Sequence, residues 1–182
     1  MLHNVCDDQA TLEMLNLQKE KPELVIGVKA DKLVKLLKKA GWNAFNVKKS
    51  GEVLDLLKKN PEINAVSFWN GKDAYTAEYL SDAMLSLNNY SCDITGMVGV
   101  QSYQKGIWTP SGDFSKENFL VDHVFTDTLV FRPGVSRLQD FVESLFSGKE
   151  EVSVESGYAR TSFEYGLNGA EAKAEAWKEI IL

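Results

Sequence analysis

The sequence predicts an α/β fold with a mostly parallel sheet that is flanked by helices. Three observations support this prediction. Short strand-like runs alternate with helices of about ten residues in the first half of the chain. The run INAVSFW at 63–69 is almost continuously apolar, which is typical of a strand buried on both faces. Two longer strand-like runs in the second half add an antiparallel element.

The first half contains the clearest strand and helix signals. Strands are predicted at 23–28, 43–47 and 63–69, and helices at 31–41 and 50–61. Strands separated by helices in this way imply right-handed crossovers and parallel pairing. A receiver-like or flavodoxin-like domain also fits this half, but it leaves the strand-rich second half unexplained.

The second half combines longer strands with helices and a loop. Residues 1–20 are predicted to be helical, so no strand is expected before residue 23. We expect the whole chain, residues 1–182, to form one domain. The remaining predicted elements are a helix at 76–88, strands at 92–103 and 123–133, a surface loop at 104–118, a helix at 134–148, a hairpin or strand at 157–166 and a helix at 171–181.

The charge of the chain restricts its partners. A net charge of -6 and a pI near 5.0 argue against nucleic acid. A local basic run is interpreted as exposed helix faces, with a phosphate or nucleic-acid patch as the alternative. Its members are Lys35, Lys38, Lys39, Lys48, Lys49, Lys58 and Lys59.

Cysteine usage and hydropathy bear on the compartment. Cys6 and Cys92 lack CxxC spacing, so neither a disulfide framework nor a zinc site is expected. No apolar run approaches the roughly 18 to 20 residues of a membrane span. We therefore expect a cytoplasmic protein whose association with a membrane, if any, is peripheral.

Three sequence blocks occur in an informative order. The blocks are DAYTAEYLSDAMLSLNNYSCDITG at 73–96, DTLVFRPGVSRL at 127–138 and SGKEEVSV at 147–154. They resemble, in the same order, segments of the large inverting family of GT-A glycosyltransferases, particularly bacterial members that act on cell-surface polysaccharides and teichoic acids. The resemblance covers roughly residues 63–165 and implies a GT-A-like, Rossmann-like domain. It also implies that this chain lacks the family's first strand.

The resemblance places the donor and metal site just after the strand at 63–69. The family has a cluster of acids there, which binds a divalent cation and the donor diphosphate. This chain has Asn70, Gly71, Lys72 and Asp73 instead, so Asp73 is the only acid left as a metal ligand. Because Lys72 repels a cation and attracts phosphate, we expect weak binding of Mn²⁺ or Mg²⁺ and a donor site formed by Asn70, Lys72 and Asp73.

The resemblance also implies catalytic and acceptor residues. Glu151 stands where the family has its catalytic base, although Glu150 and Glu151 also fit an exposed acidic pair. Trp108 can stack on a sugar or anchor its loop. The implied function is transfer of a sugar from a nucleotide-sugar donor to a glycan or cell-surface polymer acceptor. The alternative is a non-catalytic GT-A-like module that binds a glycan, a nucleotide or a partner.

Overall fold

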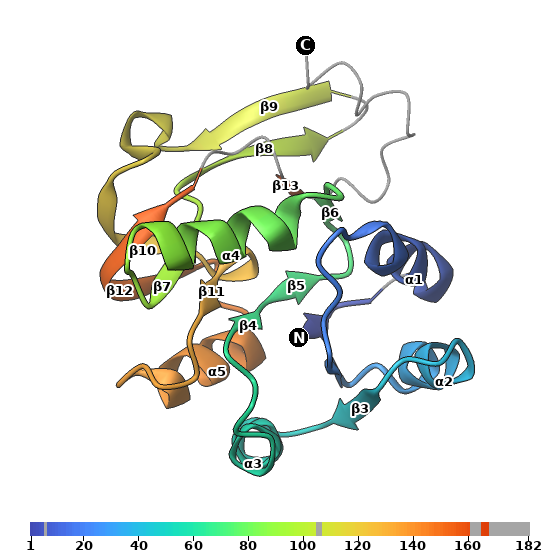
Figure 1. Cartoon of the computed structure of the whole chain (residues 1–182). Coiled ribbons are helices and arrows are strands. Elements are labelled where there is room, and N and C mark those ends of the chain that lie inside the picture. The colour runs from blue at the N-terminus through green and yellow to red at the C-terminus, as the bar shows by residue number, and fades with distance from the viewer. Residues whose placement is uncertain (6, 105–106, 161–164, 168–182) are drawn as a thin grey trace.

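The computed structural model describes residues 1–5, 7–104, 107–160 and 165–167. Its helices pack on both faces of a central mixed sheet, and a smaller sheet lies at one end (Figure 1). The predicted α/β class with helices flanking the sheet is confirmed.

One half of the central sheet is entirely parallel. Its strand order is β3-β2-β1-β5, and every neighbouring pair runs in the same direction. Three helices make the crossovers between these strands: α1 (Asp8–Leu17), and the two that the sequence predicted as crossovers, α2 and α3. The elements are β1 (Leu2–His3), β2 (Val25–Val28), α2 (Asp31–Lys39), β3 (Ala44–Val47), α3 (Ser50–Lys59) and β5 (Trp69–Asn70).

The other half of the central sheet is mixed, with strand order β10-β12-β7-β11-β4. The strand β11 is antiparallel to both of its neighbours, and β10 is antiparallel to β12. This half is the antiparallel element that the sequence predicted. Its strands are β4 (Val66–Ser67), β7 (Ile94–Gly96), β10 (Leu120–Phe125), β11 (Val130–Phe131) and β12 (Glu151–Ala159).

The strand predicted at 63–69 joins the two halves. It forms as two short pieces, β4 and β5, on either side of Phe68. The Phe68 amide donates to the Leu129 carbonyl oxygen at 3.0 Å, whereas the next amide, that of Trp69, donates to the Met1 carbonyl oxygen at 2.7 Å. The segment 66–70 is therefore hydrogen bonded to the mixed half on one side and to the parallel half on the other.

Two predicted strands are interrupted. The strand predicted at 92–103 divides at Met97 and Val98 into β7 and a strand of the small sheet. The strand predicted at 123–133 is broken by a 3₁₀ turn at Thr126–Thr128. The predicted surface loop at 104–118 is also wrong in part, because it contains a strand. The small sheet consists of β6 (Ala74–Tyr75), β13 (Tyr165–Leu167), β8 (Gly99–Gln104) and β9 (Ile107–Gly112).

The helices cover the two faces of the central sheet with separate apolar clusters. The helices α3 and α5 contribute to one cluster, through residues such as Leu57 and Phe141. The helices α1 and α2 contribute to the other, through residues such as Leu15 and Leu37. The helices not yet given bounds are α4 (Tyr79–Asn89) and α5 (Leu138–Ser147).

The first 20 residues differ from the prediction. They do not form one helix, because Leu2–His3 pairs as β1 between β2 and β5. The helix α1 begins only after Asp7, whose side chain accepts hydrogen bonds from the amides of Gln9 and Ala10. A strand of two residues is too short to produce a hydrophobic period, so no sequence pattern indicates it.

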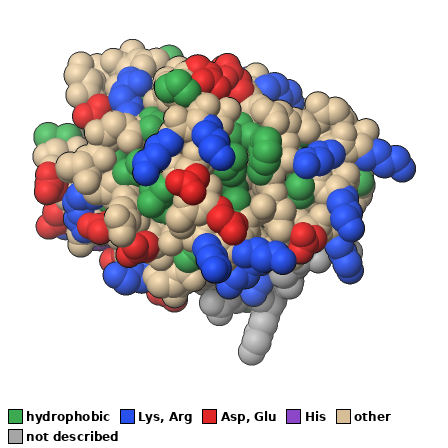
Figure 2. All heavy atoms as spheres, turned by 90° about the horizontal axis from the view of Figure 1, so that it is seen from below, with side chains coloured by type: hydrophobic (Ala, Val, Ile, Leu, Met, Phe, Trp, Pro, Cys, Tyr) green, Lys and Arg blue, Asp and Glu red, His purple; other side chains and the backbone are tan. Residues whose placement is uncertain are grey.

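The surface agrees with the interpretation of the lysine run. Each of its seven lysines is exposed. Figure 2 shows Lys and Arg side chains interspersed with Asp and Glu around a hydrophobic patch on one face. None of the described helices has the length and hydropathy needed to cross a bilayer. The helix predicted at 171–181 lies outside the described residues.

Candidate functional site

The candidate site lies where the parallel strands end. Because β1, β2 and β5 run in the same direction, the residues that follow them lie at one edge of the sheet. Such an edge is where open α/β sheets bind their ligands. The segments concerned are Asn4–Val5 after β1, Lys29–Asp31 after β2 and Gly71–Asp73 after β5.

Asp127 joins two of these strands through its carboxylate. It lies in the 3₁₀ turn at Thr126–Thr128, with one oxygen 2.5 Å from His3 Nε2. Its other carboxylate oxygen accepts a hydrogen bond from Asn70 Nδ2 at 3.0 Å. Both side-chain oxygens are therefore engaged by groups at the ends of β1 and β5.

Further contacts fix the orientation of Asn70. Its backbone amide donates to the Tyr75 hydroxyl at 2.8 Å, and its side-chain oxygen accepts from the Lys72 amide at 3.1 Å. The Tyr75 hydroxyl in turn donates to the Asp127 carbonyl oxygen at 3.2 Å. The ring of Tyr75 stacks on Trp69 with centroids 4.1 Å apart. The turn that follows β5 is consequently held by contacts among its own residues and with Asp127.

The sequence-predicted metal ligand is enclosed. Asp73 follows β5 as expected, but its exposed fraction is 0%. Its neighbour Lys72 is exposed. Among the described residues, no group of three or more His, Cys, Asp and Glu side chains could hold a metal ion. The side chain of Asn70 is already hydrogen bonded to Asp127 and to the Lys72 amide. Asn70, Lys72 and Asp73 therefore do not fit the ligand set that Mg²⁺ or Mn²⁺ requires.

A pocket of about 570 Å³ opens at the ends of β1 and β2. This volume lies within the range of small-molecule sites in proteins. The pocket combines two lysines, two aspartates, a histidine and an asparagine with apolar side chains from the end of α5. Its lining residues are His3, Asn4, Val5, Asp8, Val28, Lys29, Ala30, Asp31, Lys32, Leu145 and Phe146. We call it the carboxyl-end pocket.

The loop after β2 is held in place by Asn46 of β3. The Asn46 side-chain oxygen accepts from the Ala30 amide, and its amide nitrogen donates to the Asp31 carboxylate, both at 2.8 Å. Lys29 has a positive φ of 54° and donates through its backbone to Val47 at 2.9 Å. These bonds order the backbone from which Lys29 and Lys32 extend at the lining of the pocket.

The other predicted residues lie outside the lining of this pocket. Glu151 is exposed at the start of β12, opposite Phe125 in the register. The carbonyl oxygen of Glu150 accepts from the Thr126 amide at 2.8 Å, so the start of β12 lies along the segment that carries Asp127. Trp108 lies on β9 and packs against Tyr103, with ring centroids 4.9 Å apart.

Sequence reasoning missed His3, Asp127, Lys29 and Lys32. No local pattern marked Asp127, because the side chains that it contacts lie 124 and 57 positions away in the sequence. For His3 and the lysines, only the sheet order could reveal the site.

The described elements form an α/β fold with a pocket at the carboxyl ends of its parallel strands. No family model and no curated protein sequence matches this chain. Solved structures do match, and they support a GT-A-like fold for this chain. One is S. aureus TarS 1-349, with 14% identity, a TM-score of 0.52, and coverage of 99% of this chain and 61% of that chain.

The same protein matches in two liganded forms. The structure of S. aureus TarS 1-349 in complex with UDP is 14% identical, with a TM-score of 0.52 and coverage of 100% of this chain and 62% of that one. The complex with UDP-GlcNAc is 15% identical, with a TM-score of 0.52 and coverage of 99% and 63%. This chain thus spans less than two thirds of those chains. At such identities the likeness establishes the fold.

Proposed function

We propose that this chain is a glycosyltransferase-like domain that binds a nucleotide sugar in the carboxyl-end pocket. The observation that carries the proposal is the pairing of Lys29 and Lys32 with a pocket at the carboxyl ends of parallel strands. Lysine is a common partner of phosphate groups. The TarS structures with UDP and UDP-GlcNAc support this ligand class, because they share the fold.

The finer proposal concerns the reaction. The donor's sugar would pass to a hydroxyl of a glycan or a cell-surface polymer such as teichoic acid. Glu151 would take the proton of that hydroxyl while the bond between the sugar and the diphosphate breaks and a new glycosidic bond forms with inversion. The exposed carboxylate of Glu151, beside the segment that carries Asp127, supports this role. Trp108 is proposed to stack on the acceptor.

The leaving diphosphate needs positive charge. The residues at the family's metal position do not fit a divalent cation, so we assign this charge to lysines. Lys29 and Lys32 line the carboxyl-end pocket, and Lys72 is exposed after β5. Lysine contributes as a point charge to a phosphate. Asn70 and Asp73 would then shape the donor site through the turn that they stabilise.

A second candidate function is a non-catalytic GT-A-like binding module. The observation in its favour is that the acids near the donor site are buried or are hydrogen bonded to other groups of the protein. Asp73 is fully buried, and both carboxylate oxygens of Asp127 are hydrogen bonded within the protein. Such a module would bind the nucleotide or a glycan without transferring a sugar.

Calorimetric titration with UDP and UDP-sugars, with and without Mn²⁺, tests both candidates. Lys29→Ala and Lys32→Ala should each weaken UDP binding, and Lys59→Ala should not, because Lys59 is exposed at the end of α3 and does not line the pocket. Unchanged affinity in both pocket variants, or no binding of UDP to the unmodified chain, would overturn the nucleotide site. UDP binding without transfer to any glycan acceptor would favour the module.

A further inference from the structure

A basic surface surrounds the outermost strand of the parallel half. In the order β3-β2-β1-β5, β3 is the edge strand, and α2 and α3 pack on opposite faces of the sheet beside it. Figure 2 shows the molecule from this side, since α3 and β3 lie low in Figure 1. We call this surface the basic face. Its exposed lysines, on α2, on α3 and between β3 and α3, are Lys35, Lys38, Lys39, Lys48, Lys49, Lys58 and Lys59.

The basic face belongs to a segment whose charge is opposite to that of the whole chain. Residues 29–59 contain nine lysines and three acids, a net charge of +6, although the chain as a whole has a net charge of -6. The rest of the chain therefore carries a charge of -12. Two of the three acids are engaged locally, because Asp31 accepts from Asn46 Nδ2 at 2.8 Å and Glu52 accepts from the Lys48 amide at 2.7 Å. Positive charge is thus concentrated at one edge of the sheet.

Helix stability explains only part of this charge. The last turns of α2 and α3 each contain two lysines, where cations complement the helix dipole. Lys48 and Lys49 lie instead directly before α3, where the positive end of the dipole disfavours a cation. The side chain of Lys49, at the N-cap position, makes no capping hydrogen bond. A pair of cations at an unfavourable helix end points to an anionic partner outside the protein.

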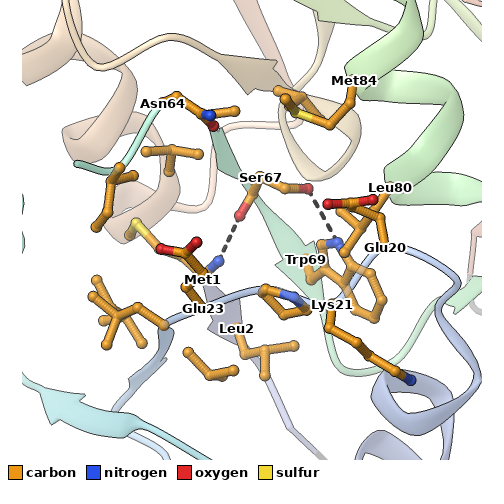
Figure 3. A pocket seen from close by; sticks show the side chains of 18 of the residues that line it. Met1, Leu2, Glu20, Lys21, Glu23, Asn64, Ser67, Trp69, Leu80 and Met84 are labelled. Carbon is orange, nitrogen blue, oxygen red and sulfur yellow. Dashed lines mark hydrogen bonds between the residues drawn. The ribbon is translucent and has the colours of Figure 1, made fainter.

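The basic face is wider than one phosphate group, and its lysines lie outside both pockets. A helix of ten residues rises about 15 Å, so the lysine pairs at the two ends of α3 are separated by that distance along its axis. The carboxyl-end pocket is lined by Lys29 and Lys32. The pocket of about 230 Å³ in Figure 3 is lined by Lys21, beside Glu20 and Glu23. An exposed surface of this width fits an extended array of anions.

The composition of the basic face favours lipid headgroups over nucleic acid. Residues 29–59 contain no arginine, which is the side chain suited to forked contacts with a phosphate or a base. Lysine is a point charge on a flexible stem, so it can follow mobile anions. Phe45 on β3 is 40% exposed, and Lys38 Nζ lies 5.5 Å from the centre of its ring. Lysines beside an exposed aromatic ring are typical of surfaces that lie in a membrane interface.

We propose that the basic face binds the surface of a bilayer that contains anionic lipids, with its lysines at the headgroup phosphates and Phe45 among the headgroups. Each lysine near such a surface strengthens binding about fivefold. Because salt screens charges beyond about 8 Å, acids on the far side of the domain oppose this contact only weakly. Lys48 and Lys49 follow β3 at the same edge as the carboxyl-end pocket, but the proposal does not rest on a nucleotide in that pocket.

Cosedimentation with lipid vesicles tests the proposal. We expect binding to vesicles of phosphatidylcholine mixed with phosphatidylglycerol, no binding to phosphatidylcholine alone, and release as the NaCl concentration rises. Phosphatidylserine should replace phosphatidylglycerol without loss, because the lysines respond to charge. Soluble glycerol phosphate should not compete, since a single phosphate contacts too few of the lysines.

Paired variants locate the contact. Lys48→Gln combined with Lys49→Gln should weaken vesicle binding about 25-fold, and the thermal midpoint should not fall because the change removes cations from the start of α3. The control, Lys19→Gln combined with Lys116→Gln, removes the same charge from lysines that pair with Glu78 and Asp113. It should bind vesicles like the unmodified chain.

A second pair of variants tests the aromatic contact. Phe45→Ala should weaken vesicle binding about three- to tenfold and leave its salt dependence unchanged, because the ring contributes apolar area and no charge. Phe119→Ala is the control, since Phe119 is 63% exposed beside β10.

Three results would overturn the proposal. The first is no binding to anionic vesicles at low salt, or equal binding to phosphatidylcholine alone. The second is an equal effect of the two lysine pairs. The third is binding of a mixed-sequence DNA duplex in the absence of any binding to anionic vesicles, which would assign the basic face to nucleic acid.

Discussion

His3 Nε2 and Asp127 Oδ1 lie 2.5 Å apart, although 124 positions separate the two residues in the sequence. The contact connects the end of β1 to the turn between β10 and β11. Since Asp127 also accepts from Asn70 at 3.0 Å, one carboxylate holds the ends of two strands beside the carboxyl-end pocket. The shape of the candidate donor site therefore depends on a residue that does not line the pocket.

Asp127→Asn tests this dependence. The amide retains one hydrogen-bond acceptor but loses the charge that His3 and Asn70 contact. We expect the free energy of unfolding to fall by about 1.5 to 3 kcal/mol, the usual range for a hydrogen bond to a charged group. Urea denaturation measures it. Asp122→Asn is the control because Asp122 is an exposed acid that contacts His123 on β10. Equal stability of the two variants would contradict the role of Asp127.

Gly71→Ala should damage the same edge sterically. A Cβ at Gly71 would lie 2.6 Å from Val5 Cα, and backbone at that distance cannot move aside without shifting β1. We expect a loss of about 1 to 3 kcal/mol in the free energy of unfolding. Gly51→Ala in α3 meets nothing within 4 Å and should stabilise the protein by up to about 1 kcal/mol. Thermal unfolding of both variants should show shifts of opposite sign.

The stability of the protein should decrease in strong alkali because of Tyr158. Burial, followed by the neighbouring Tyr90, raises the pKa of Tyr158 to about 12 from its ordinary value of 10.0. The ring stacks on Tyr90 at 3.9 Å and its hydroxyl bonds Asn118 at 3.1 Å. The unfolded chain thus releases this proton first, so the contribution to stability is complete below pH 10 and is lost as the pH rises toward 12.

Tyrosinate absorbance and unfolding curves check this assignment. Compared with the unmodified chain, Tyr158→Phe should remove one late-titrating tyrosine and flatten the decline in stability between pH 10 and 12. Tyr103→Phe, on β8, should leave the decline in place. An unchanged decline in Tyr158→Phe would assign it to another group.

If the protein transfers a sugar, Glu151→Gln should lower turnover by about 100- to 10,000-fold and leave donor affinity unchanged. Glutamine keeps the shape of the side chain but cannot accept the proton of the acceptor hydroxyl. Glu150→Gln is the matched control, because Glu150 contacts Thr126 through its backbone oxygen, which the substitution retains. Similar loss in both variants, or in neither, would remove Glu151 from the role of base.

Divalent cations should bind weakly in the absence of nucleotide. Asp73 is buried and Lys72 adds a positive charge to the same turn, so a hard cation finds too few free oxygen ligands. Lys72→Asp should increase the affinity for Mn²⁺ in calorimetry, whereas Lys49→Asp, at an exposed position before α3, should not. Tight Mn²⁺ binding by the unmodified chain would show that other acids complete a site.

The parallel half of the fold could be predicted because its signals are local. Strands and helices there are separated by residues such as Asp31 and Gly41, which begin and end a helix in the sequence itself. The interruptions in the second half had no such signal. Two of the three residues of the turn at Thr126–Thr128 are threonines, which favour strands, and both are buried.

The direction of the strands could be predicted from the sequence, and with it the edge after 63–69 where ligands of such sheets bind. The location of a functional site at this edge stays a prediction. The burial of Asp73 and the pairing of His3 with Asp127 depend on tertiary packing, to which sequence patterns are insensitive. The roles of Glu151, Trp108 and the donor-site residues stay predictions.

The shared segment 66–70 has a consequence for how the domain opens. Because consecutive amides, those of Phe68 and Trp69, are bonded to opposite halves of the sheet, neither half can separate without breaking bonds of this segment. Local opening of the β8–β9 hairpin leaves these bonds intact, whereas opening at Met1 frees the Trp69 amide. The amide of Phe68, which is bonded to Leu129, should therefore exchange with deuterium only through global unfolding, and the amide of Trp69 should exchange faster.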